Sequence, residues 1–191
     1  MISPSKLILL WMLLLLVWGC TNPFHPKMRN LPSYSNRTPG EVLNNLVLAY
    51  KQKNIELYKT LLAEDFRFEL ISSEVSQIGT DMNGDGINDD WWGYDQEVEY
   101  TTNLFQYGSS DGIYPPPDEI DLKLSIPGAE YWEIDPQQGN EDWVVIPCSF
   151  TLTLTYNQLG SSLTATGTAR FYLKPVGDRW YIAVWRDESN L

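Results

Sequence analysis

Oxygen-bearing side chains recur at alternate positions of a glycine-containing stretch, Asp81 to Asp90. Calcium takes roughly six to eight oxygen ligands, and a single loop supplies them from its positions 1, 3, 5, 7 and 9, with glycine at position 6 for the turn. Counted from the first aspartate, these ligands are Asp81, Asn83, Asp85, the backbone carbonyl of Ile87, and Asp89. Gly86 occupies the turn position, so the stretch predicts a calcium loop.

This pattern resembles the first half of the calcium loops of EF-hand and dockerin proteins. The twelfth position departs from it, because Trp92 stands where those loops carry a bidentate carboxylate. Asp90, Asp95 or Glu97 could supply the missing oxygens. The alternative interpretation is a solvated acidic turn, since Asp, Asn and Gly also dominate ordinary loops.

Residues for histidine or cysteine chemistry are few. His25 is the one histidine, and it lies between prolines in a stretch without periodicity. Cys20 and Cys148 are the two cysteines, which is too few for a disulfide framework or a zinc site. Cys148 alternates with Ile146 and Phe150 on the apolar side of a predicted strand. We therefore expect a buried structural thiol there rather than a nucleophile, which would need a basic neighbour.

Carboxylates and tyrosines are the remaining candidates for acid–base chemistry. Asp65, Tyr58, Tyr100 and Asp118 could take this role, and nothing in the sequence ranks them. For each of them, the interpretation as a solvated, capping or packed residue is favoured. Six tryptophans could likewise stack on a ligand, but their irregular spacing favours core and pocket lining; they are Trp91, Trp92, Trp132, Trp143, Trp180 and Trp185.

Three helices are predicted from capping residues followed by apolar positions at helical spacing. Thr38 and Glu41 form a capping box, with Pro39 at the first helical position. Asn54 caps a second, short helix, and Asp95 caps a third. Between the second and third helices, residues 66–70 alternate as a first strand.

The longest strand pattern runs from Asp142 to Tyr156, where apolar residues occupy every second position and threonines lie between them. Residues 120–126 alternate before it, and residues 163–173 and 180–184 alternate after it. Short turns join the last three of these strands, so we expect an antiparallel meander.

The N-terminal residues form an apolar run, Leu7 to Val17, that ends shortly before Gly19-Cys20. The run is too short for a comfortable membrane span, and it matches a signal-peptide core. The segment resembles a bacterial lipoprotein signal, although Trp18 departs from the small residue usual at that position. The resemblance implies a signal peptide over residues 1–19, lipid (palmitate) on Cys20, and a flexible tether over residues 20–37.

The same resemblance implies attachment to the bacterial cell envelope, facing outside the cytoplasm. Thr21, rather than an aspartate, follows Cys20, which implies release to the outer membrane where the cell has one. Residues 38–191 then form a single domain. The net charge of −12 argues against a nucleic-acid partner.

Two helices, a strand, a third helix and a run of long antiparallel strands make an α+β order. The stretch GEVLNNLVLAYKQKNIELYKTLLAEDFRFEL with the closing WYIAVWRDE resembles the nuclear transport factor 2-like superfamily, over about Pro39 to Glu188. The resemblance implies N-terminal helices packed against a curved, mainly antiparallel sheet, a cone-like fold with a pocket. It is similar in particular to small bacterial lipoproteins of that superfamily with no assigned activity.

Two function classes follow from the resemblance. One is a non-catalytic domain that binds a small apolar ligand or a protein partner. The other is a pocket enzyme of the isomerase or dehydratase kind, in which a carboxylate and a tyrosine act as acid and base. The lack of a pocket histidine favours the first class.

The calcium loop predicts a measurable stabilisation. Calcium added to the folded protein should bind with a dissociation constant on the order of 10⁻⁴–10⁻³ M and raise the melting temperature, since the aspartates repel one another without a cation. The double variant Asp81→Ala/Asp85→Ala should lose both responses in calorimetry and thermal unfolding. Equal responses in the two proteins would leave an acidic turn.

Overall fold

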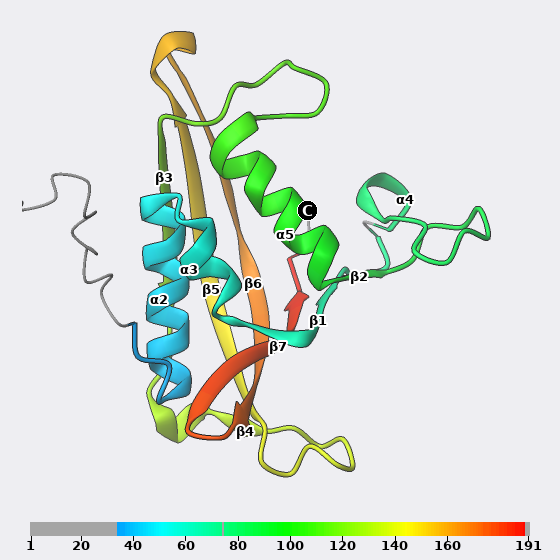
Figure 1. The fold of residues 1–191 in the computed structure, drawn as a ribbon, viewed down its shortest axis with the longest axis vertical. Coiled ribbons are helices and arrows are strands. Elements are labelled where there is room, and N and C mark those ends of the chain that lie inside the picture. Colours follow the sequence, from blue (N-terminus) through cyan, green and yellow to red (C-terminus); the bar gives the residue numbers. More distant parts are fainter. Residues whose placement is uncertain (1–33, 74, 190–191) are drawn as a thin grey trace, which may run out of the picture. The chain divides into compact units, whose positions relative to one another are not determined.

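The computed structural model describes residues 34–73 and 75–189 (Figure 1). The predicted signal peptide, Cys20 and His25 lie outside the described residues. Between Tyr34 and Ser189, leaving aside residue 74, no helix combines the length and the apolar composition that a membrane crossing requires.

The first two helices begin at the predicted caps. Helix α2 spans Pro39–Gln52, and the Thr38 hydroxyl accepts the N–H of Glu41 at 3.2 Å. The return half of the capping box differs, because the Glu41 carboxylate accepts the N–H of Arg37 at 2.9 Å instead of that of Thr38. Helix α3 spans Ile55–Lys59 behind Asn54, whose side chain accepts the N–H of Leu57 at 3.0 Å.

Seven strands form one sheet in the order β2-β1-β7-β6-β5-β3, with β4 pairing β5 off this path. Their bounds are Leu62–Glu69 (β1), Trp91–Gly93 (β2), Glu119–Ser125 (β3), Glu133–Ile134 (β4), Val144–Tyr156 (β5), Ser161–Val176 (β6) and Arg179–Asp187 (β7). The β5-β6-β7 meander is confirmed, and every pair is antiparallel except β1 with β7, which is parallel. The sheet curls as a half-barrel around the helices, so the predicted α+β fold with a curved, mainly antiparallel sheet is confirmed (Figure 1).

The third predicted helix exists, but its start differs. Helix α5 spans Tyr94–Thr102 behind Gly93, which offers no side-chain cap, so the prediction of Asp95 as the cap is wrong. The helix then widens into a π-helix, η1, at Asn103–Tyr107. The sequence pattern did not predict this widening, nor the short elements α4 (Val75–Ile78), η2 (Ala129–Tyr131) and η3 (Asn157–Leu159).

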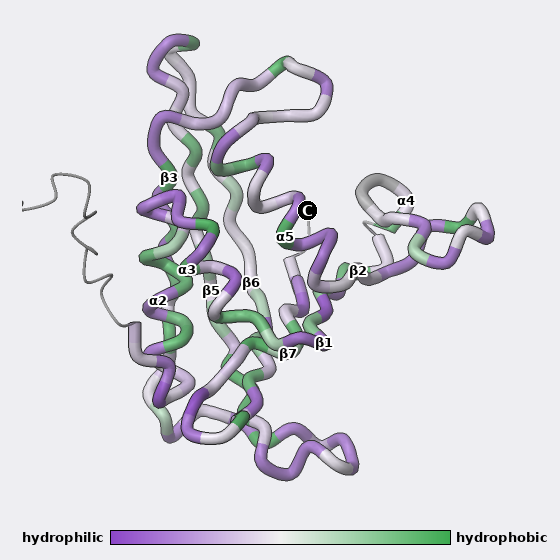
Figure 2. The backbone as a smooth tube through the Cα atoms, in the orientation of Figure 1, coloured by the Kyte–Doolittle hydropathy of each residue, from purple (hydrophilic) through white to green (hydrophobic). Residues whose placement is uncertain are grey.

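The core lies between α2, α3 and the inner face of the sheet. Its fully buried side chains include Leu43 and Leu46 of α2, and Phe171 and Ile182 of the sheet. Figure 2 shows hydrophobic residues along α2 and the neighbouring strands, whereas the projecting loops are mainly hydrophilic. Cys148 is 3 % exposed, and burial raises the pKa of its thiol to about 12, which confirms a packed cysteine.

The inward-facing set on β5 is only partly core. Ile146 is fully buried, but Phe150, Leu152 and Leu154 are half-buried and pack at the margin of the core. The β5–β6 hairpin extends beyond the end of α2 (Figure 1), and Leu163 there is exposed.

Candidate functional site

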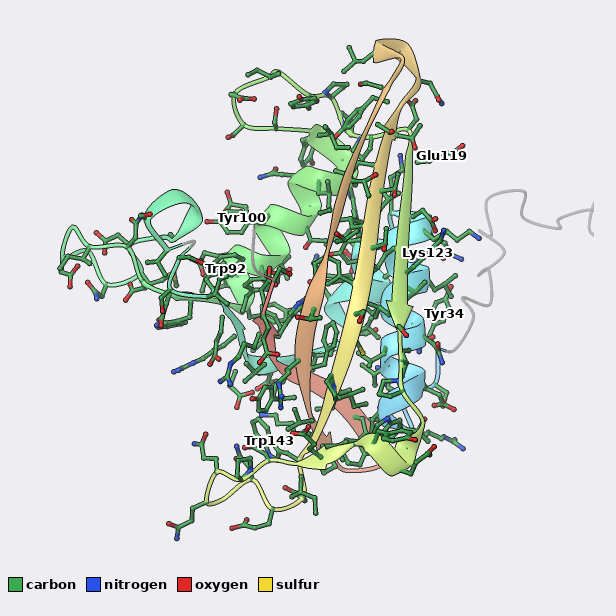
Figure 3. The ribbon with its side chains drawn as sticks, turned by 180° about the vertical axis from the view of Figure 1, so that it is seen from behind. Tyr34, Trp92, Tyr100, Glu119, Lys123 and Trp143 are labelled. Carbon is green, nitrogen blue, oxygen red and sulfur yellow. The ribbon has the colours of Figure 1, made fainter. Side chains whose placement is uncertain are left out.

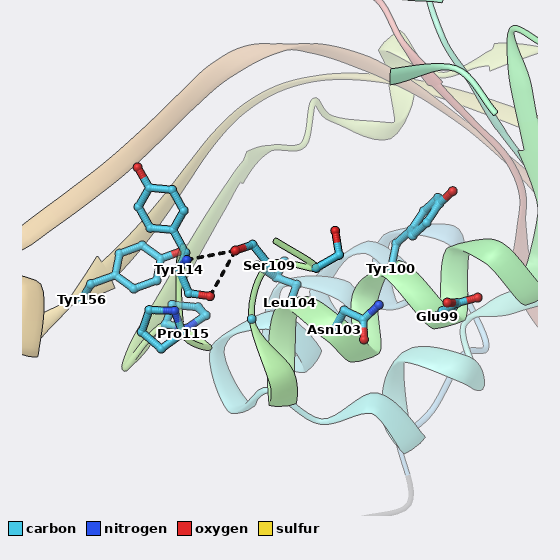
Figure 4. A pocket seen from close by; sticks show the side chains of 11 residues that line it. Glu99, Tyr100, Asn103, Leu104, Ser109, Tyr114, Pro115 and Tyr156 are labelled. Atoms are coloured by element: carbon cyan, nitrogen blue, oxygen red, sulfur yellow. Dashed lines mark hydrogen bonds between the residues drawn. The ribbon is translucent and has the colours of Figure 1, made fainter. Parts of the chain in front are cut away.

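A cleft of about 440 Å³ lies beside α5 and η1. Its walls are one side of these helices, the loop of residues 108–117, and the end of β5 (Figure 4). The residues that line it are Glu99, Tyr100, Asn103, Leu104, Gly108, Ser109, Ser110, Tyr114, Pro115, Pro117 and Tyr156. This volume is within the range of small-molecule sites, roughly 300–1,000 Å³.

Gly108 allows the loop to turn back over the cleft. It ends η1 with a φ of 90°, and a Cβ there would lie 2.2 Å from the carbonyl oxygen of Tyr114. The loop then closes on itself, because the N–H of Ser109 donates to the Tyr114 carbonyl at 2.8 Å and the Ser109 hydroxyl accepts the N–H of Tyr114 at 2.9 Å. These bonds fix the Tyr114 backbone at the cleft.

The cleft has an apolar aromatic end and a polar end. At the first, the rings of Tyr114 and Tyr156 lie 5.5 Å apart, and burial raises the pKa of Tyr156 with a smaller contribution from Tyr114. At the second end, Figure 4 shows Tyr100 beside the Glu99 carboxylate. Leu104 lies between the two ends (Figure 4), so the arrangement suits a ligand with an apolar body.

Tyr100 is held in place by two neighbours. Its ring meets the Trp92 ring edge-on at 5.4 Å, and its hydroxyl lies 3.0 Å from that of Thr80. Figure 3 shows Trp92 and Tyr100 next to each other, where β2 meets α5. The wall of the cleft is therefore tied to the sheet through Trp92.

A buried carboxylate, Glu97, lies behind this wall. It is 5 % exposed and accepts hydrogen bonds from the Tyr58 hydroxyl at 2.5 Å, Trp92 Nε1 at 2.7 Å and the Thr101 hydroxyl at 3.1 Å. Burial raises the pKa of Glu97, and the three donors oppose this shift. Neither Glu97 nor Tyr58 lines the cleft.

This role of Glu97 was not predicted from the sequence, where the residue was expected only as a possible calcium ligand. Both of its carboxylate oxygens accept hydrogen bonds in the core, so that suggestion is corrected. One signal was present: Glu97 lies four residues before Thr101 and eight before Phe105, on the stripe of α5 that is buried. A carboxylate on a buried stripe requires hydrogen-bond donors around it.

The four acid–base candidates are not brought together. Tyr58 is buried with Glu97, whereas Tyr100 is 41 % exposed at the cleft. Asp65 pairs with Lys174 on the surface, and Asp118 accepts the N–H of Asn157 at 2.7 Å. These residues therefore do not form a shared catalytic group.

The acidic loop is ordered by its own backbone. The Asp81 carboxylate accepts the N–H groups of Gly84, Asp85 and Gly86, and these bonds, that of Gly86 first, lower its pKa. Among residues 34–189 apart from 74, no group of three or more His, Cys, Asp or Glu side chains is placed to hold a metal ion. Calcium binding by Asp81, Asn83, Asp85, Ile87 and Asp89 stays a prediction.

No protein family and no curated protein matches the sequence. Solved structures do match the fold. A candidate scytalone dehydratase from Novosphingobium aromaticivorans aligns with a TM-score of 0.55 and 8 % identity, covering 80 % of this chain and 81 % of that one. A conserved protein from Planctomyces limnophilus aligns with a TM-score of 0.53 and 12 % identity, covering 76 % and 88 %.

A nuclear transport factor 2-like superfamily protein from Salmonella enterica aligns with a TM-score of 0.50 and 15 % identity, covering 79 % of this chain and 87 % of that one. At these identities the likeness concerns the fold alone. The described domain has the cone-like α+β fold of the nuclear transport factor 2-like superfamily.

Proposed function

We propose that this chain is a bacterial envelope lipoprotein whose domain binds a small, mainly apolar ligand without acting on it chemically. The cleft beside α5 carries the proposal. It combines apolar and aromatic walls with a few polar groups, which is the usual composition of a small-molecule site. A protein partner on the same surface is the alternative occupant.

An enzyme would need an acid or base that reaches the ligand. Glu97 is the buried carboxylate that favours this second candidate, and structural relatives include a candidate scytalone dehydratase. Its oxygens, however, accept bonds from Tyr58, Trp92 and Thr101, and it does not line the cleft. A general base must come within hydrogen-bonding distance of its proton. We therefore assign Glu97 a structural role.

The anchoring part of the proposal rests on the apolar run that closes on Gly19-Cys20. Two or more acyl chains on Cys20, with each buried CH₂ contributing about 0.8 kcal/mol, would give stable attachment to a membrane. The folded domain would then face the outside of the cytoplasm on its tether.

Filling the cleft should abolish ligand binding. Asn103→Phe places a ring in the cleft from η1, whereas Gln106→Phe adds the same ring at an exposed position of η1 outside the lining. With naphthol as probe in saturation-transfer NMR, the wild type and Gln106→Phe should bind alike. Binding by Asn103→Phe should fall by an order of magnitude or more, because the volume is occupied. Equal binding by all three proteins would refute the cleft as the site.

Removing Cys20 should release the protein from the membrane. In cells fed a clickable palmitate analogue, Cys20→Ala should be unlabelled and recovered in the soluble or unprocessed fraction. Cys148→Ala removes the other cysteine and is the matched control, which should stay labelled and membrane-bound. If Cys20→Ala were still acylated and bound to the membrane, the lipoprotein assignment would be wrong.

Glu97→Gln should change how stability depends on pH. The folded protein binds the Glu97 proton more tightly than the unfolded chain, so the free energy of unfolding should fall as the pH rises from about 4.5 towards the raised pKa. An amide there can accept from Trp92 and donate to the hydroxyls of Tyr58 and Thr101, and it does not ionise. In denaturant unfolding, the variant should lack this part of the pH dependence. Parallel curves for both proteins would contradict the burial argument.

A further inference from the structure

The cleft is built by the part of the chain that carries no basic residue. Residues 68–122 contain no Lys, Arg or His, and they contain 13 of the 25 acidic residues of the protein. This segment supplies α5, η1 and the loop of residues 108–117. It therefore contains every residue that lines the cleft except Tyr156. Glu99 is the charged residue of that lining, and a charge in a cleft attracts ligands of the opposite sign.

Glu99 places a negative charge at the cleft itself. Its side chain is exposed on α5, one helical turn before Asn103, and both line the cleft. Among the side chains that the structure describes (residues 34–189 without 74, 77 and 78), the Glu99 carboxylate has no ion pair and no side-chain hydrogen bond. The nearby cation Lys53 donates to the backbone carbonyls of Pro117 at 2.9 Å and of Asp118 at 3.3 Å, so its ammonium is occupied there.

Tyrosine faces add a second source of attraction for a cation. A cation over an aromatic ring is stabilised by the ring quadrupole, and the cleft carries Tyr100 beside Glu99 at one end. Tyr114 and Tyr156 form the apolar aromatic end (Figure 4). One end of the cleft therefore suits an apolar or aromatic group, and the other end suits a cationic group, which are the two parts of an aromatic amine.

We propose that the cleft takes an elongated organic ammonium ion. Its apolar or aromatic body packs against Leu104, Tyr114 and Tyr156, and its cationic head lies at Glu99 and Tyr100. This inference rests on the proposed ligand-binding function and adds the charge of the ligand to it.

Two probes of equal length separate the charge from the apolar body: phenylbutylamine, which is cationic at neutral pH, and phenylbutanol, which is neutral. Calorimetric titration uses the full-length chain in zwitterionic nanodiscs, with empty nanodiscs as the blank. At low ionic strength the amine should bind roughly three- to tenfold more tightly than the alcohol. Salt should reduce this preference, because the cleft is open to solvent.

Glu99→Gln should remove most of the preference for the amine and leave the affinity for the alcohol unchanged. Glu130→Gln, the same change on η2 at the opposite end of the domain in Figure 1, should leave both affinities unchanged. Equal affinities for both probes, insensitive to Glu99→Gln and to salt, would overturn the cationic ligand but keep the cleft as a site. If Asn103→Phe still bound both probes, or if the wild type bound neither probe, both proposals would be overturned.

Discussion

The hydrogen bonds to Glu97 determine where α5 lies. They join α5 to α3 through Tyr58 and to β2 through Trp92, so one carboxylate connects two helices and the edge of the sheet. A buried carboxylate without these donors would be costly, and donors without the carboxylate would be left unpaired. The position of α5 is therefore set by polar complementarity as well as by packing. Because α5 forms one wall of the cleft, the position of the cleft depends on the same contacts.

The two sides of α5 and η1 have different surroundings. Tyr50, Tyr58 and Phe105 pack edge-on at ring distances of 5.2 to 6.3 Å and fill the space between helices and sheet near Glu97. The solvent-exposed side of α5 and η1 instead faces the cleft. Glu97 lies on the buried stripe of α5 and not on the side that lines the cleft, which explains why Glu97 and the cleft are separate.

The sequence allowed most of the fold to be predicted where the signal is local. The caps at Thr38 and Asn54 and the long strand β5 are encoded by neighbouring residues, and the structure confirms them. The parallel pairing of β1 with β7 was not predicted, because it joins segments more than a hundred residues apart. The cleft was missed for the same reason: Tyr156 meets Tyr114 only after the loop has folded back at Gly108.

The parallel pair also constrains the order of events in folding. Strand β7 lies between β1 and β6, so the last strand of the chain occupies an interior position of the sheet. Strand β1 pairs with β7, and β6 also pairs with β7. Until residues 179–187 are in place, no strand pairing therefore connects β1 to the β3-β5-β6 part of the sheet. Such distant pairing slows folding. The sheet of this topology therefore stays divided until β7 joins its two parts.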